Sequence, residues 1–117
     1  DARGFFFGAP IAIKLKAGLV GARKPGKLPY VGARVEYDLE YGKNALEAPK
    51  GVLKPSDRVL IVDDLLATGG SAAAMTALVK KSKAKLVGYS FLIELTDLKG
   101  RKVLKPVKIH SLVKYKI

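Results

Sequence analysis

The sequence predicts an α/β fold built around a parallel sheet. Strand-like segments, either alternating in polarity or rich in β-branched residues, are separated by segments with helical spacing. Strands that alternate with helices are joined by right-handed crossovers in a parallel sheet. A ligand site in such a sheet lies beyond the carboxyl ends of its strands. The chain has 117 residues, 49% of them hydrophobic, which suits one domain with a real core.

The first half of the chain predicts a helix followed by a hairpin. A helix, a short strand, a basic loop, a strand and a returning strand are expected at residues 5–16, 19–22, 23–29, 33–41 and 45–48. Apolar and charged residues alternate along the longer strand, which is typical of a strand with one face in water. The segment Gly42-Lys43-Asn44 is expected to turn the chain between the two strands of the hairpin.

The second half predicts the parallel sheet itself. A central strand, a helix, a strand, a polar loop or short helix and a last strand are expected at residues 58–62, 72–81, 85–95, 96–105 and 107–115. The first of these strands is a run of apolar, mostly β-branched residues, as in a strand buried on both faces. The helix that follows it is rich in alanine, and lysines gather where it is expected to end, which suits the helix dipole.

The chemistry is concentrated between the central strand and this helix. Asp63 and Asp64 close the strand, and a short loop ending in Thr-Gly-Gly-Ser leads into the helix. Backbone N–H groups and the positive end of the helix dipole make such a loop an anion site. Gly69 and Gly70 let a ligand approach the backbone, and hydroxyl groups flank them on both sides.

The acidic pair beside this anion site indicates a sugar phosphate. A phosphate alone gains nothing from two neighbouring carboxylates, whereas the vicinal hydroxyls of a ribose can donate hydrogen bonds to Asp63 and Asp64. The alternative is an ordinary turn between strand and helix, capped by Ser71, with both carboxylates in solvent. The complete string of strand, acidic pair, glycine loop and helix favours the ligand site.

This arrangement resembles the phosphoribosyl-pyrophosphate motif of the type I phosphoribosyltransferases. The resemblance implies that Asp63 and Asp64 bind the ribose hydroxyls. It also implies that the sugar's phosphate is bound by the five loop residues Ala67, Thr68, Gly69, Gly70 and Ser71. Four further segments are similar to the adenine-specific branch of this family, namely residues 1–5, 23–29, 39–42 and 94–101. They resemble its pyrophosphate loop, its basic loop, its closing loop and a wall of its base pocket.

The resemblance implies a type I phosphoribosyltransferase core with a flexible hairpin loop, formed by residues 1–117 as one domain. In the family an N-terminal segment comes before the equivalent of Asp1 and contributes to base recognition. We expect that this segment is absent here, which places base specificity in question and leaves the phosphoribosyl site complete.

The implied reaction is transfer of a phosphoribosyl group from phosphoribosyl pyrophosphate to adenine, giving AMP and pyrophosphate. The expected catalytic residues are Arg3 on the leaving pyrophosphate, Lys27 as a further positive charge, and Glu40 as a base or acceptor for the purine. Five further residues are expected to contact substrate: Arg23, Lys24, Tyr41, Leu65 and Leu95. Mg²⁺ is expected as the cofactor, bound mainly through phosphoribosyl pyrophosphate and not at a protein metal site. The alternative for the charged residues is a solvated surface role.

Composition restricts the partners. The absence of cysteine excludes disulfides and thiolate metal sites, and no apolar run approaches the roughly 20 residues that span a bilayer. A net charge of +12 suits a polyanionic substrate, and it equally suits nucleic acid, a possible partner that we do not favour. The expectation is a cytoplasmic homodimeric enzyme of purine salvage that does not bind membranes. The alternative function is a non-catalytic phosphoribosyl-pyrophosphate-binding module or regulator with a basic nucleic-acid-binding surface.

Overall fold

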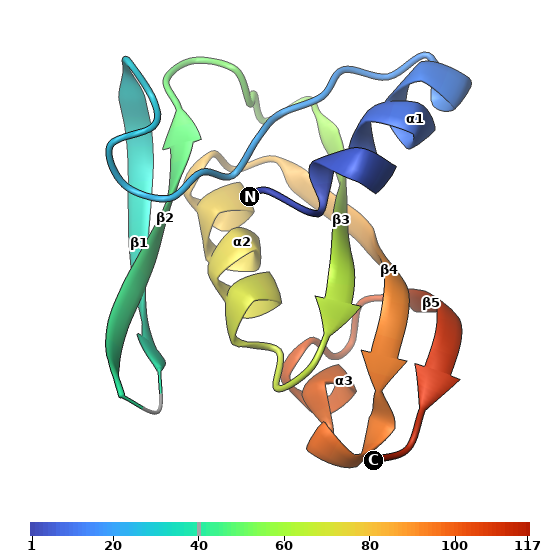
Figure 1. Ribbon diagram of the computed structural model, residues 1–117. Helices are drawn as coiled ribbons and strands as arrows, with labels where there is room; N and C mark the ends of the chain where they lie inside the picture. Colours follow the sequence, from blue (N-terminus) through green and yellow to red (C-terminus); the bar gives the residue numbers. More distant parts are fainter. Residues whose placement is uncertain (40) are drawn as a thin grey trace.

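The computed structural model describes residues 1–39 and 41–117, and it leaves the side chain of Leu39 undescribed. It has two layers of strands with a helix between them (Figure 1). The elements along the chain are α1 (Phe5–Leu15), β1 (Val31–Leu39), β2 (Gly42–Pro49), β3 (Arg58–Leu66), α2 (Gly70–Lys81), β4 (Lys85–Leu95), the 3₁₀ turn η1 (Thr96–Leu98), α3 (Gly100–Val103) and β5 (Ile109–Tyr115).

The strands form an antiparallel pair and a parallel sheet. In the first, β1 pairs with β2; in the second, β3, β4 and β5 are parallel neighbours in that order. This confirms the predicted fold class, and the helix predicted at residues 72–81 and the strand at 85–95 are also confirmed. The described residues contain no helix long and apolar enough to cross a membrane.

Helix α2 is packed on two faces, which explains its small residues. Ala72 and Val79 belong to a core with Phe91 and other residues of the parallel sheet. Ala74 and Leu78 belong to a second core beneath β2. Alanine on both faces lets the sheet and the hairpin approach the same helix closely, so the hairpin lies alongside α2 (Figure 1).

Two predictions about the first half need correction, and a third is confirmed. Residues 19–22 form no strand, because only Arg23 meets a partner, in an isolated bridge with Glu47. Gly42 does not begin a turn; it pairs with Leu39 as the first residue of β2, so this strand starts earlier than expected. The alternation along β1 is confirmed, since its even-numbered residues from Arg34 to Asp38 are exposed.

The strand predicted at residues 58–62 is longer and extends to Leu66. The parallel ladder continues through Asp63, opposite Phe91, to Leu66, so the acidic pair lies inside β3 and does not close it. Within the described part of the chain β3 pairs with β4 alone. A largely apolar cavity of about 640 Å³ lies along β3, α1 and α2.

Candidate functional site

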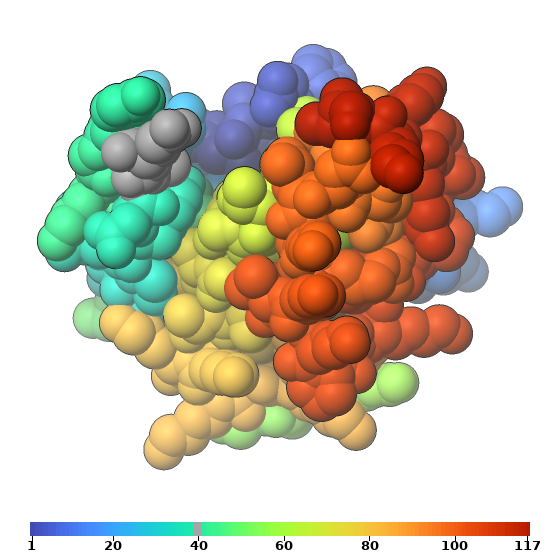
Figure 2. Space-filling view, turned by 90° about the horizontal axis from the view of Figure 1, so that it is seen from below, coloured from blue at the N-terminus to red at the C-terminus, as the bar shows by residue number. Residues whose placement is uncertain are grey.

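The second half of β3 and the start of α2 enclose a small cavity at the carboxyl end of the sheet. Its volume is about 230 Å³, and it is lined by Asp1, Arg3 and every residue from Asp63 to Ala72. Figure 2 looks onto this end of the molecule, where the loop between β3 and α2 lies between the hairpin and the segment of residues 94–104. The position agrees with the rule that parallel sheets bind ligands beyond the carboxyl ends of their strands.

The acidic pair carries the strongest electrostatic perturbation of the site. The Asp64 N–H donates a hydrogen bond of 2.9 Å to Asp63 Oδ1. Burial raises the pKa of Asp63 from 3.8 to about 6; the hydrogen bond from the Asp64 N–H opposes this increase, and the Asp64 carboxyl group adds to it. Arg3 compensates the other carboxylate, with its Nε 2.9 Å from Asp64 Oδ2. The Arg3 side chain is 77% exposed, so this arginine is free to exchange Asp64 for a ligand.

The glycine loop has the geometry of an anion site. Gly69 has a φ of +94°, a left-handed conformation that favours glycine, and it is the N-cap of α2. No side chain caps this helix end, so the N–H groups of its first turn remain available to a ligand. Leu65, Ala67, Thr68, Gly70 and Ser71 line the same cavity.

The first residues of the chain cross directly over the acidic pair. A Cβ atom at Gly4 would lie 2.8 Å from Asp63 Oδ1, so the absence of a side chain there permits the crossing. Asp1 draws the basic loop to the same place. Its Oδ2 accepts a 3.0 Å hydrogen bond from the Lys24 N–H and lies 3.3 Å from Arg23 Nε. The Arg23 guanidinium also stacks over Phe5 at 5.5 Å.

The structure does not bring every expected residue to this place. Lys27 is exposed on the basic loop, and Tyr41 is 90% exposed at the tip of the hairpin. Leu95 ends β4 opposite Tyr115. These three lie outside the lining of both cavities as the described residues define them, and so does Arg23; Lys24 lines the larger cavity and not the small one. Glu40 lies outside the described residues.

Relatives of known function cover the whole chain. No family model matches it. Adenine phosphoribosyltransferase from Clostridium perfringens is 56% identical over all 117 residues, which span 68% of that protein. The enzyme of the same name from Thermosynechococcus vestitus is 53% identical over 115 residues, which are 98% of this chain and 68% of that protein. The chain belongs to the adenine phosphoribosyltransferase family.

Solved adenine phosphoribosyltransferases have the same fold. The crystal structure from Thermoanaerobacter pseudethanolicus is 50% identical, with a TM-score of 0.95 over 98% of this chain and 67% of that one. The Saccharomyces cerevisiae enzyme, complexed with an imino-altritol bisphosphate and adenine, is 43% identical, with a TM-score of 0.91 over 96% of this chain and 63% of that one. Their similarity extends to all the elements that position the acidic pair and the glycine loop.

Sequence reasoning missed two contacts of this adenine phosphoribosyltransferase site. Tyr37, on the inward face of β1, lines the larger cavity with Asp63 and Ser71, and its ring would lie 3.8 Å from a Cβ at Gly70. The inward position in an alternating strand was the available signal. Gly100 packs against the glycine loop from the opposite side. That contact joins residues far apart in the sequence, so no local sequence pattern could have predicted it.

The described residues contain no cluster of three His, Cys, Asp or Glu side chains that could hold a metal. The two carboxylates of the acidic pair nevertheless suit a hard cation that is bound mainly through a substrate's phosphates. Mg²⁺ commonly uses one or two carboxylates together with phosphate oxygens and water, and not a complete protein cage. The donor set therefore fits a magnesium ion that arrives with a pyrophosphate ligand.

Proposed function

We infer that this chain transfers the phosphoribosyl group of phosphoribosyl pyrophosphate to adenine, giving AMP and pyrophosphate. The single observation that carries the inference is the small cavity, which joins an acidic pair to a glycine loop and a helix N-terminus. One side of it accepts hydrogen bonds and the other donates them. A sugar phosphate matches both sides, and the family's reaction acts on such a ligand.

Each part of the cavity has a role in this reaction. The loop from Ala67 to Ser71 holds the sugar's phosphate through backbone N–H groups. Asp63 and Asp64 accept hydrogen bonds from the ribose hydroxyls and fix the sugar ring. Arg3 leaves Asp64 and binds the pyrophosphate, where negative charge grows as the bond to the anomeric carbon breaks.

The other basic residues support the leaving group to different degrees. Arg23 and Lys24 contact Asp1, which lines the cavity, and they add positive charge beside it. Lys27 and Tyr41 are proposed from the family resemblance, and both require the basic loop or the hairpin to close over the substrate. Glu40, proposed as the acceptor for the purine, belongs to the same closing segment. Leu95 is proposed as part of the wall around the base.

Magnesium, a homodimer and a cytoplasmic location complete the proposal. A magnesium ion would neutralise the pyrophosphate and suits the acidic pair, as argued above. The homodimer is supported by exposed apolar side chains on one face of α1, where Phe6 and Ile13 are 76% and 79% exposed. Among the residues that the structure describes, we find no feature that favours a non-catalytic regulator, and none of the comparisons favours one.

The test is synthesis of AMP from phosphoribosyl pyrophosphate and adenine by the purified chain, with Mg²⁺ present. AMP and pyrophosphate should appear in equal amounts, and Asp63→Asn combined with Asp64→Asn should abolish both. Hypoxanthine and guanine are the control bases, and adenine should be preferred over each. Failure of the parent chain to form AMP while it still binds ribose 5-phosphate would limit the function to binding.

A further inference from the structure

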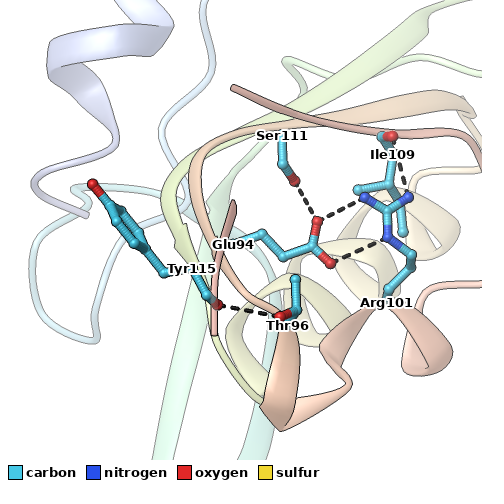
Figure 3. Close-up of polar contacts among 6 residues, drawn as sticks. All are labelled: Glu94, Thr96, Arg101, Ile109, Ser111 and Tyr115. Carbon is cyan, nitrogen blue, oxygen red and sulfur yellow. Dashed lines mark hydrogen bonds and ion pairs between the residues drawn. The ribbon is translucent and has the colours of Figure 1, made fainter. Parts of the chain in front are cut away.

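A buried polar cluster ties together the end of β4, the start of β5 and α3 (Figure 3). Glu94, only 4% exposed, accepts two hydrogen bonds from the Arg101 guanidinium, of 3.1 Å from Nε and 2.7 Å from Nη2. Ser111 Oγ donates a third, of 2.7 Å, to the same carboxylate. Arg101 Nη1 also donates to the Ile109 carbonyl at 3.4 Å. A two-pronged pair of this kind fixes the direction of the arginine as well as its position.

Gly100, the residue before Arg101, lies directly against the glycine loop that is proposed to bind the phosphate. A Cβ atom at Gly100 would collide with the Ala67 carbonyl oxygen and would lie 2.9 Å from Leu66 Cδ1 and 3.1 Å from the Gly69 N. In return, a Cβ atom at Gly69 would lie 3.1 Å from the Gly100 carbonyl oxygen and 3.3 Å from Val103 Cβ. The two glycines therefore allow backbone to pack on backbone, and Figure 2 shows the segment of residues 94–104 beside the loop.

We propose that the Arg101–Glu94 pair is a positioning device for the phosphate loop, which holds Gly100 as a rigid support behind residues 67–69. The proposal rests on the proposed function, in which this loop binds the phosphate of the sugar. Neither Arg101 nor Glu94 lines the small cavity, so they act through the support and not by touching a ligand.

The length of α3 explains why such a device is needed. This helix has four residues, too few to be stable without tertiary contacts. Leu104, 3% exposed in the main core, anchors its carboxyl end. At its amino end the anchor is Arg101, whose guanidinium holds the pKa of Glu94 below its ordinary value. Without the pair, α3 is held at one end only, and Gly100 is free to move away from the loop.

The experiment compares Arg101→Ala and Arg101→Lys with a matched control. Arg34→Ala removes another arginine–glutamate pair, in which Arg34 Nη1 lies 3.3 Å from a buried Glu47 carboxylate on the hairpin. The Arg34 and Glu47 side chains are 47% and 8% exposed, and those of Arg101 and Glu94 are 38% and 5% exposed, so the two pairs are alike in burial. Hydrogen exchange of peptides covering residues 64–72 measures how rigid the loop is when no ligand is bound. The KM values for phosphoribosyl pyrophosphate and for adenine then show whether binding of either substrate is weakened.

Arg101→Ala should speed exchange in residues 64–72 and leave the exchange of the hairpin unchanged. It should raise the KM for phosphoribosyl pyrophosphate by about tenfold and the KM for adenine by less than about twofold, because small displacements of a binding group are costly. Arg101→Lys should give an intermediate result, and Arg34→Ala should leave loop exchange as in the parent.

Two results would overturn the proposal: unchanged loop exchange in folded Arg101→Lys and Arg101→Ala, or an equal rise in both KM values. If Arg101→Ala does not fold, Arg101→Lys and Gly100→Ala decide the question, because the added methyl group of Gly100→Ala pushes the support away from Ala67 directly. If the parent chain makes no AMP, the proposed function fails, and loop exchange still tests the positioning role.

Discussion

Replacing Asp63 with asparagine should stabilise the protein at neutral pH while weakening its ligand site. Burial raises the pKa of Asp63 from 3.8 to about 6, so the folded state disfavours the charged carboxylate. A difference of roughly two pH units corresponds to about 3 kcal/mol of folding free energy. Asparagine carries no charge, and its amide oxygen can still accept the 2.9 Å hydrogen bond from the Asp64 N–H. We therefore expect Asp63→Asn to gain about 1–3 kcal/mol at neutral pH.

The pH dependence gives the sign of this effect. A carboxyl group whose folded pKa is raised contributes stability that is fully present below its ordinary value of 3.8 and is lost as the pH rises through about 6. Urea unfolding should therefore show the largest gain for Asp63→Asn near pH 8 and almost none below about pH 4. In the same variant, calorimetric titration with ribose 5-phosphate should show a loss of about 1.5–3 kcal/mol, because one charged acceptor is removed.

Asp64→Asn is the matched control. It removes a carboxylate from the same pair, but that carboxylate is paired with an arginine that is 77% exposed. The Asp64 side chain itself is 21% exposed, so loss of this partly exposed ion pair should change stability by about 1 kcal/mol or less. Equal or lower stability of Asp63→Asn relative to the parent near pH 8 would refute the reasoning, since it would mean that the buried charge imposes no cost.

Three further predictions concern the loop, the leaving group and association. Gly69→Val should abolish binding of ribose 5-phosphate in calorimetry, because its φ is +94° and its Cβ would meet the Gly100 carbonyl oxygen at 3.1 Å; parent-like affinity would remove the loop from the phosphate site. Arg3→Ala should lower the rate of AMP synthesis far more than it weakens AMP binding, since AMP lacks the pyrophosphate; equal losses would contradict the role of Arg3. Ile13→Lys should shift sedimentation from dimer to monomer, because this side chain is 79% exposed on the apolar face of α1; an unchanged dimer would place the interface elsewhere.

The elements that depend on local pattern could be predicted from the sequence. The strand at residues 85–95 and the helix after Ser71 have their own composition and periodicity, and both form where expected. Residues 19–22 also have strand-like composition, but a strand needs a partner, and the fold supplies one only at Arg23. The continuation of β3 through Asp63 has the same origin, because the ladder to β4 and not local composition decides where the strand ends.

The residues of the candidate site also divide into those that a local motif predicts and those that only the fold brings together. Its acidic pair and glycine loop are contiguous in the sequence, so one motif predicted their proximity, and they line one cavity. Lys27, Tyr41 and Leu95 were predicted by resemblance and lie outside that cavity: the first two are on connections between elements, and Leu95 is held at the end of β4 opposite Tyr115, and no local pattern encodes these placements. The support by Gly100 could not be predicted either, because it joins two backbones about thirty residues apart in a contact that only the fold creates.

The electrostatics of the cavity explain why a ligand needs both a ribose and a phosphate. The uncapped start of α2 attracts an anion, whereas the two carboxylates repel one that lies too close to them. Inorganic phosphate gains from the first and loses to the second, and ribose alone gains only from the carboxylates. A phosphate carried on the far end of a ribose satisfies both, because the sugar separates the negative groups and gives its hydroxyls to the carboxylates. Arg3 already neutralises Asp64 in the free protein, so a pyrophosphate on the anomeric carbon must compete for this arginine. A ribose phosphate can therefore bind without displacing Arg3, and a ligand that offers ribose hydroxyls and pyrophosphate together offsets both the cost of burying Asp63 and the competition for Arg3.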